Sequence, residues 1–102
     1  MAFIIELTYE AEKDLDGIRS FYRNQILDAL DDSLQYTPTQ VNRSRIKRLR
    51  GIDSPAYRLR VGEHRVYYDV DLAGETVTIL RILTKEESLR YLNEVADENN
   101  DN

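Results

Sequence analysis

The sequence of 102 residues contains no cysteine and no tryptophan, and it has a single histidine, His64. The absence of cysteine excludes disulfides, thiolate nucleophiles and cysteine zinc sites, and one histidine cannot form a histidine metal cluster. No apolar run reaches the roughly 20 residues that cross a bilayer, and the N-terminus lacks the basic flank and apolar stretch of a signal peptide. These absences predict a cytoplasmic protein without a metal, a cofactor or a membrane anchor.

The composition that remains is typical of one small globular domain. A chain of this length can bury about 65% of its unfolded surface, which suffices for a core without metal or disulfide staples. Hydrophobic residues make up 41% and charged residues 32%, the proportions of a folded chain rather than a disordered one. We expect a single domain over residues 1–96 and a polar tail over residues 97–102 that frays.

The net charge of −5 conceals a basic segment within an acidic chain. Residues 43–65 carry eight cations and two acids, whereas the segments before and after them carry three cations each against eight and nine acids. A Debye length of about 8 Å screens distant exposed charges, so a basic band can bind an anion although the whole chain is acidic. A run of charge can equally be a solvated face without a partner.

The first part of the chain predicts a strand followed by helix. Residues 2–7 are apolar and β-branched, which favours an N-terminal strand, and Thr8 is a suitable N-cap for a helix. An apolar stripe at helical spacing then runs from Ala11 to Leu34 and ends before Pro38. This pattern fits either one long helix or a helical hairpin.

The second part of the chain predicts a sheet and a last helix. Residues 39–50 are polar and basic, and residues 51–55 have the Gly and Pro of a loop. Three alternating or β-branched runs follow, at residues 56–61, 65–70 and 76–83. Apolar residues at helical spacing then predict a short C-terminal helix at residues 86–96. The expected fold is α+β, with an antiparallel sheet of about four strands.

A two-residue turn at Gly62-Glu63 fixes the pairing of the strands beside it. Counting outward gives these pairs: Val61 with His64, Arg60 with Arg65, Leu59 with Val66, Arg58 with Tyr67 and Tyr57 with Tyr68. One face of the hairpin is then apolar, and the other carries three arginines and Tyr67. Because like charges directly opposite destabilise a hairpin, these arginines need counter-ions. Asp69 is the nearest candidate within the chain, and a bound phosphate is the alternative that we favour.

Three blocks of sequence resemble a known family. They are KRLRG at residues 47–51, YRLRVGEHRVYY at residues 57–68 and VTILRILTK at residues 77–85, with Tyr91 beyond them. In this order they resemble the RelE/ParE superfamily of toxins from bacterial type II toxin–antitoxin modules, over roughly residues 2–96. The resemblance implies a RelE-like α+β fold and a cognate antitoxin protein as partner.

The resemblance also implies two alternative activities. RelE-like members cleave mRNA in the ribosomal A site, whereas ParE-like members inhibit DNA gyrase and lack the nuclease residues. The retained Arg58, Arg60 and Arg65 favour a metal-independent, ribosome-dependent endoribonuclease. The acidic net charge and Lys85, which stands where the family has arginine or histidine, favour the gyrase inhibitor.

The resemblance assigns roles to individual residues. Arg65 matches the phosphate-binding arginine, Arg58 and Arg60 match cations that line the site, and Tyr91 matches a tyrosine that positions or activates the substrate. With Lys85, these are the expected catalytic residues. Four further residues are expected to bind RNA: Lys47, Arg48, Arg50 and Arg81.

Cleavage of RNA by its own 2′-OH needs a phosphate clamp and a proton acceptor. Arginine can clamp the phosphate but is a poor acceptor, so we expect Tyr91, with its pKa lowered by nearby guanidiniums, or Lys85 to take the proton. His64 is the conventional base, but the predicted register puts it on the core side or at the turn. Structural roles stay open: Tyr91 can be a packing residue, Lys85 a surface residue and Arg81 an ion-paired strand residue.

Overall fold

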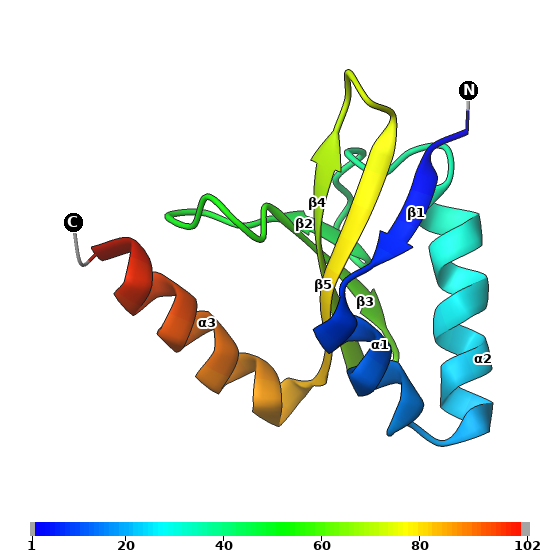
Figure 1. Cartoon of the computed structure of the whole chain (residues 1–102), viewed down its shortest axis with the longest axis horizontal. Helices are drawn as coiled ribbons and strands as arrows, with labels where there is room; N and C mark the ends of the chain where they lie inside the picture. The colour runs from blue at the N-terminus through cyan, green and yellow to red at the C-terminus, as the bar shows by residue number, and fades with distance from the viewer. Residues whose placement is uncertain (1, 101–102) are drawn as a thin grey trace.

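The computed structural model describes residues 2–100 and shows a five-stranded sheet with helices on both faces (Figure 1). Along the chain the elements are β1 (Ile4–Leu7), α1 (Tyr9–Asp16), α2 (Ser20–Ala29), the π-helix η1 (Leu30–Leu34), β2 (Ile46–Arg48), β3 (Tyr57–Val61), β4 (His64–Asp71), β5 (Thr76–Thr84) and α3 (Lys85–Asn100). The strand order is β1-β5-β4-β3-β2, with β1 parallel to β5 and every other pair antiparallel. The predicted α+β class is confirmed.

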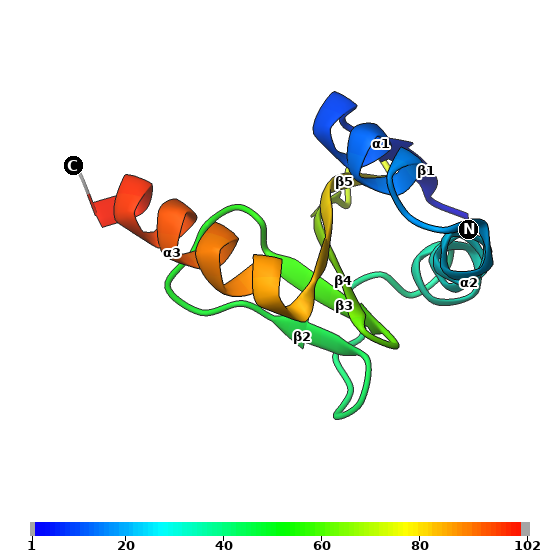
Figure 2. The ribbon, with the colours of Figure 1, turned by 90° about the horizontal axis from the view of Figure 1, so that it is seen from below.

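The N-terminal helical segment consists of two helices. Thr8 caps α1 as predicted, because its Oγ1 accepts a hydrogen bond from the backbone N–H of Ala11 at 3.1 Å. Gly17 is the C-cap, and α2 begins at Ser20. The apolar stripe continues across this break because α1, α2 and η1 all pack on the core side of the sheet (Figure 2). Of the two alternatives left by the sequence, the separate helices are therefore the observed one.

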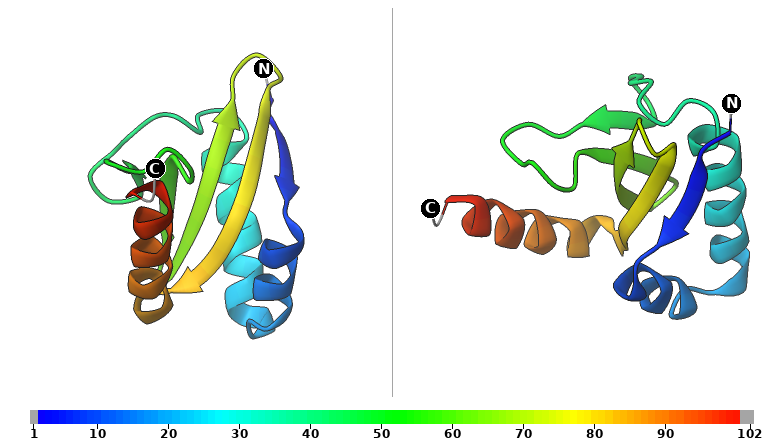
Figure 3. Two further views of the ribbon diagram at one scale, coloured as in Figure 1. Left: turned by 60° about the vertical axis from the view of Figure 1, so that its left-hand side comes forward. Right: turned by 45° about the horizontal axis from the view of Figure 1, so that its top comes forward.

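One hydrophobic core lies between the sheet and α1, α2 and η1. Its buried members are Ala11, Ile26, Ala29, Leu30, Leu34, Ile46, Leu59, Val66, Tyr68, Val77, Ile79 and Ile82. The hydroxyl of Tyr68 is satisfied inside this core, where it donates to the carbonyl of Pro38 at 2.7 Å. Helix α3 lies on the other face of the sheet (Figure 3, left) and covers part of it, where Tyr67 and Leu83 are 1% and 3% exposed. The two faces of the sheet therefore differ. The hydrophobic core covers the face toward α1, α2 and η1, whereas α3 covers only part of the other face.

Helix α1 covers the edge of β5 that extends beyond the short β1. The backbone N–H of Thr8 donates to the carbonyl of Ile79 at 3.0 Å, and its hydroxyl donates to the carbonyl of Leu80 at 3.0 Å. Further along, a carboxylate oxygen of Asp14 accepts the backbone N–H of Ile82 at 3.0 Å. The backbone and side chain of Thr8 and the side chain of Asp14 replace the ladder partners that β1 would have supplied.

An irregularity in β5 directs Arg81 toward α3. Tyr67 pairs with Arg81 and Tyr68 pairs with Ile79, so Leu80 is an extra residue in the ladder. A bulge of this kind shifts the alternation of faces by one residue. Arg81 consequently faces α3, while the neighbouring Ile82 remains in the core.

Some predicted boundaries are wrong. The polar segment 39–50 contains β2, which adds a fifth strand beside β3. Helix α3 is 16 residues long and continues beyond the predicted end at residue 96, through residues 97–100. Residues 101–102 lie outside the described part of the chain. Within residues 2–100, no helix is long and apolar enough to span a membrane.

Candidate functional site

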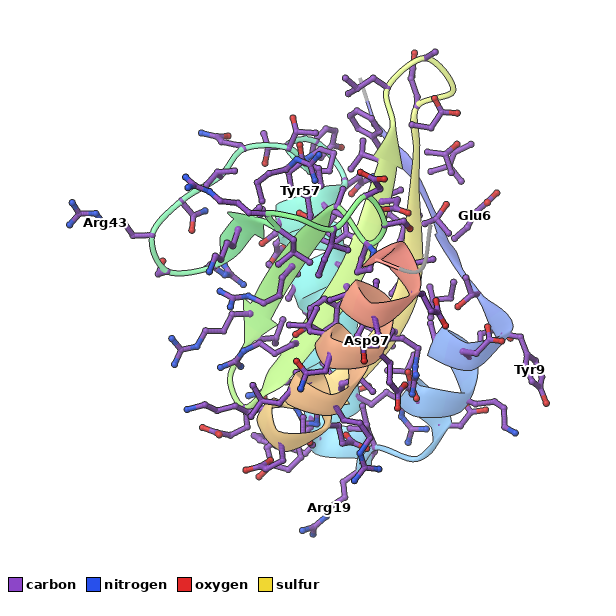
Figure 4. All side chains as sticks on the ribbon, turned by 90° about the vertical axis from the view of Figure 1, so that its left-hand side faces the viewer. Glu6, Tyr9, Arg19, Arg43, Tyr57 and Asp97 are labelled. Carbon is purple, nitrogen blue, oxygen red and sulfur yellow. The ribbon has the colours of Figure 1, made fainter. Side chains whose placement is uncertain are left out.

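The β3–β4 hairpin brings three arginines to the face of the sheet that carries α3. The predicted register is confirmed at all five pairs, including Arg60 with Arg65 and Arg58 with Tyr67. Gly62 opens the turn with a φ of 59°, a conformation that glycine adopts without strain. Arg58, Arg60 and Arg65 are called the arginine face below. Figure 4 looks onto α3 and shows nitrogen-ended side chains extending outward along this side of the sheet.

The arginine face lacks internal counter-ions. Among the described side chains, the single salt bridge joins Arg81 to Asp14, away from these three arginines. The Nε of Arg58 is buried without a hydrogen-bond partner. Burial lowers the pKa of Arg58, and the charges of Arg65 and Arg60 lower it further, whereas Tyr67 opposes them. Arg58 thus has one buried guanidinium nitrogen without an acceptor, beside two like charges, and an anion would relieve both.

Asp69, the nearest candidate for an internal counter-ion, has a different role. Its carboxylate accepts hydrogen bonds from the hydroxyl of Ser54 and from the backbone N–H of Ala56, the latter at 2.7 Å. These bonds attach the β2–β3 loop to β4. Asp69, the candidate counter-ion within the chain, therefore forms no salt bridge with the arginines among the described residues, because its carboxylate binds the loop. Only Arg65 has partners of its own, since its Nη1 donates to the carbonyls of Gly62 and His64 at 3.1 Å each.

The three basic residues of the 47–50 segment lie in different places. Lys47 pairs with Arg58 across β2 and β3, which adds a fourth cation to the arginine face. Because side chains alternate along a strand, Arg48 lies on the opposite face, where its Cζ is 5.2 Å from the centre of the Tyr57 ring. Arg50 is exposed in the loop after β2 and, with Lys47, lines a cavity of about 480 Å³ that reaches α3. The structure thus brings Lys47 to the site but does not bring Arg48 there.

Arg81 is held by a bidentate ion pair. Its Nε and Nη2 donate to the two carboxylate oxygens of Asp14 at 2.7 and 3.0 Å. The hydrogen bond to Asp14 raises the pKa of Arg81, and burial opposes this shift. The guanidinium also lies 5.6 Å from the centre of the Tyr91 ring. This is the ion-paired structural role that the sequence left open, and it uses two of the five guanidinium N–H donors.

Tyr91 and Lys85 both lie on α3. The ring of Tyr91 is half-buried and packs 5.3 Å from the ring of Tyr67, which is the cross-strand neighbour of Arg58. Burial raises the pKa of Tyr91 to about 12, although Arg81 works in the opposite direction. The prediction of a lowered pKa is therefore wrong, because desolvation outweighs the guanidinium. Lys85 is the exposed first residue of α3.

His64 lies on the core side of the hairpin, as its register predicts. It pairs with Val61, and its ring is 5.8 Å from the ring of Tyr22 on α2. With Tyr22 it lines a cavity of about 480 Å³ between the α1–α2 junction and the sheet. This position is on the face opposite the arginines. Within the described residues, no three His, Asp or Glu side chains group as a metal site would require.

Two features of the site escaped the sequence reasoning. Lys47 belongs to β2, and the alternation Arg45-Ile46-Lys47 around one buried isoleucine was the signal that could have shown it. Asp14 binds Arg81, which is 67 positions away in the sequence, and no local sequence pattern predicts such a pair. Both features come from tertiary pairing of short or distant segments.

Comparison with known proteins identifies relatives of this fold. Residues 5–89 match the family model of the ParE toxin of type II toxin–antitoxin systems, parDE. Similar solved structures include the RelBE2 toxin–antitoxin complex from Mycobacterium tuberculosis (TM-score 0.70, 24% identity, 83% of this chain and 100% of the other). The archaeal RelE–RelB complex from Pyrococcus horikoshii has a TM-score of 0.68 and 23% identity, over 83% of this chain and 97% of the other. A free E. coli RelE mutant has a TM-score of 0.69 and 22% identity, over 96% of this chain and 97% of the other. No curated protein sequence matches the chain. At these identities the structures show a shared fold.

Proposed function

Because the chain belongs to the ParE toxin family of type II toxin–antitoxin systems, we propose that it is a toxin that binds mRNA on the ribosome through its arginine face and cleaves it. The observation that carries this proposal is the buried Nε of Arg58, which has no acceptor and lies beside two further arginines without counter-ions. A phosphodiester supplies the missing acceptor and negative charge. RNA is a polyanion that also contains a nucleophile, the 2′-hydroxyl group next to each phosphate.

The proposed reaction is attack of the 2′-oxygen on the adjacent phosphorus. The P–O5′ bond breaks, the 2′-proton goes to a base and the 5′-oxygen takes up a proton, which leaves a 2′,3′-cyclic phosphate and a 5′-hydroxyl. Arg58, Arg60 and Arg65 orient the phosphate and stabilise the charge that develops on it. The phenol of Tyr91, whose pKa burial raises to about 12, is protonated at neutral pH and suits a hydrogen-bond donor. Lys85, at the start of α3, is the remaining candidate for proton transfer.

Primer extension after expression in bacteria tests the cleavage. Inducing the chain without an antitoxin should arrest growth and produce new 5′ ends in translated mRNA. Arg65→Ala should abolish these ends while leaving the fold intact by circular dichroism. Growth arrest with intact transcripts would overturn the nuclease proposal.

We also propose a cognate antitoxin as partner. Structural relatives are complexes of RelE with RelB, and both sheet edges of this chain, β1 and β2, have a side without a strand partner. A bound segment could add to an edge and cover the arginine face with acidic side chains. Co-expression with the neighbouring open reading frame should yield a complex and restore growth. Lack of both effects would argue against this partner.

Inhibition of DNA gyrase is the second candidate function. The family model that matches the chain is that of the ParE toxin, and burial raises the pKa of Tyr91, which makes this residue less suited to be the base of the nuclease reaction. A supercoiling assay with purified gyrase separates the two candidates. Inhibited supercoiling together with intact mRNA would favour this function.

A further inference from the structure

Arg45 extends the arginine face by one strand. Ile46 pairs with Leu59, and one residue earlier the carbonyl of Arg45 accepts a hydrogen bond from the backbone N–H of Arg60 at 2.8 Å. Arg60 in turn pairs with Arg65. Arg45, Arg60 and Arg65 therefore stand in one line across three neighbouring segments. Because side chains alternate along an extended chain, Arg45 is on the side opposite the buried Ile46.

A hydrogen-bonded turn fixes the backbone of Arg45. The side-chain oxygen of Asn42 accepts the backbone N–H groups of Arg45 and Ile46 at 2.7 and 3.3 Å. The backbone N–H of Asn42 donates to the carbonyl of Ile46 at 3.0 Å. These bonds involve no atom of the Arg45 side chain, so Arg45 can be replaced without breaking the turn, and within residues 2–100 its guanidinium forms no salt bridge.

The charges around Arg45 restrict the side from which an anion can approach. Arg45 and Arg60 form one wall of a groove of about 570 Å³, and Asp28 and Asp32 lie on its other wall. None of these four side chains makes a salt bridge among the described residues. The aspartates repel phosphate from the α2 side, whereas the α3 side of the same edge carries the arginine face.

We propose that Arg45 and Arg60 bind a second phosphate of the RNA strand, next to the one held by Arg58 and Arg65. This inference rests on the proposed binding of RNA. Strands in a sheet lie about 4.8 Å apart, so the line from Arg45 to Arg65 spans roughly 10 Å of backbone, wider than one phosphate group. Two neighbouring phosphates fit this span, and the RNA strand then leaves the site across the β2 edge of the sheet.

Two oligonucleotides of different phosphate count test the second subsite. Both carry 2′-O-methyl groups, which prevent cleavage, and neither has a terminal phosphate: a dinucleotide has one phosphodiester and a trinucleotide has two. Arg45→Gln should weaken binding of the trinucleotide about fivefold, the upper range for an exposed ion pair, and leave dinucleotide binding unchanged. On a longer single strand the salt dependence should fall by about 0.7 in log–log slope, the value of one lost contact.

Arg43→Gln is the matched control. Arg43 is exposed in the same turn, carries the same charge and extends away from the sheet (Figure 4), so its replacement should leave trinucleotide binding nearly unchanged. Equal losses for the two variants, or an equal loss of dinucleotide binding with Arg45→Gln, would overturn the second subsite alone. If the wild-type chain binds neither oligonucleotide, the proposed RNA binding fails as well.

Discussion

Replacing Arg58 by methionine should make the free protein more stable and weaken its binding of anions. The Nε of Arg58 is buried without an acceptor, and the charges of Arg65 and Arg60 act against this guanidinium. A buried donor left without a partner costs about 1–3 kcal/mol. Methionine keeps most of the aliphatic stem and removes both the donor and the charge. Because the rest of the side chain is partly exposed, we expect a gain at the lower end, about 1 kcal/mol.

Thermal unfolding followed by circular dichroism measures this gain. For a domain of this size, 1 kcal/mol raises the melting temperature by roughly 4–8 °C. Added inorganic phosphate should stabilise the wild type, because a ligand of the native state shifts the unfolding equilibrium, and should stabilise the variant less. Arg90→Met, on the exposed surface of α3, is the control and should change neither quantity. A lower melting temperature for Arg58→Met would refute the reasoning, because the guanidinium would then have partners in the free protein.

Three further predictions concern other parts of the site. Arg65→Ala should slow single-turnover cleavage of ribosome-bound mRNA roughly a hundredfold, by loss of about 3 kcal/mol of transition-state stabilisation, and Arg65→Lys should recover only part of it. Asp14→Asn breaks the bidentate pair with Arg81 and should lower the free energy of unfolding in urea by about 2 kcal/mol. Because burial raises the folded-state pKa of Tyr91 to about 12, folding stability should fall as pH rises from about 10, the unfolded value, to 12. Tyr91→Phe should reduce that alkaline loss.

Each of these predictions has a contrary outcome. Cleavage by Arg65→Ala at the wild-type rate would move the phosphate site elsewhere on the basic segment. An unchanged urea midpoint for Asp14→Asn would mean that the pair with Arg81 contributes no net stability. An alkaline unfolding curve that is the same with and without the Tyr91 hydroxyl would show that this phenol ionises equally well in both states.

Local pattern was enough to predict the hairpin that carries the arginine face. The turn at Gly62-Glu63 sets the register, and the alternation of residues 57–61 and 64–68 sets the faces, so pairing of Arg60 with Arg65 followed from sequence alone. The position of His64 on the core side of the hairpin followed from the same register. These features depend on residues within about ten positions of one another, where turn chemistry and strand period act directly.

The parts that the sequence did not predict depend on distant contacts. The raised pKa of Tyr91 arises from burial between α3 and the sheet, which no spacing of residues reveals. Asp69 is occupied by the β2–β3 loop, a contact that forms only after that loop has folded back. Strand β2 has three residues, and its period-two signal, one isoleucine between arginine and lysine, is weak without knowledge of its pairing with β3.

The parallel pairing of β1 with β5 has a consequence for how the protein is made. β1 is the first element of the chain, and its partner β5 ends at Thr84. A nascent chain therefore cannot complete its sheet or place α1 on the β5 edge until β5 has been synthesised. The antiparallel strands β3, β4 and β5 can pair through short loops, whereas closure by β1 waits for contacts across about 70 residues. Translation therefore delays closure of the sheet by β1 until β5 is available as its partner.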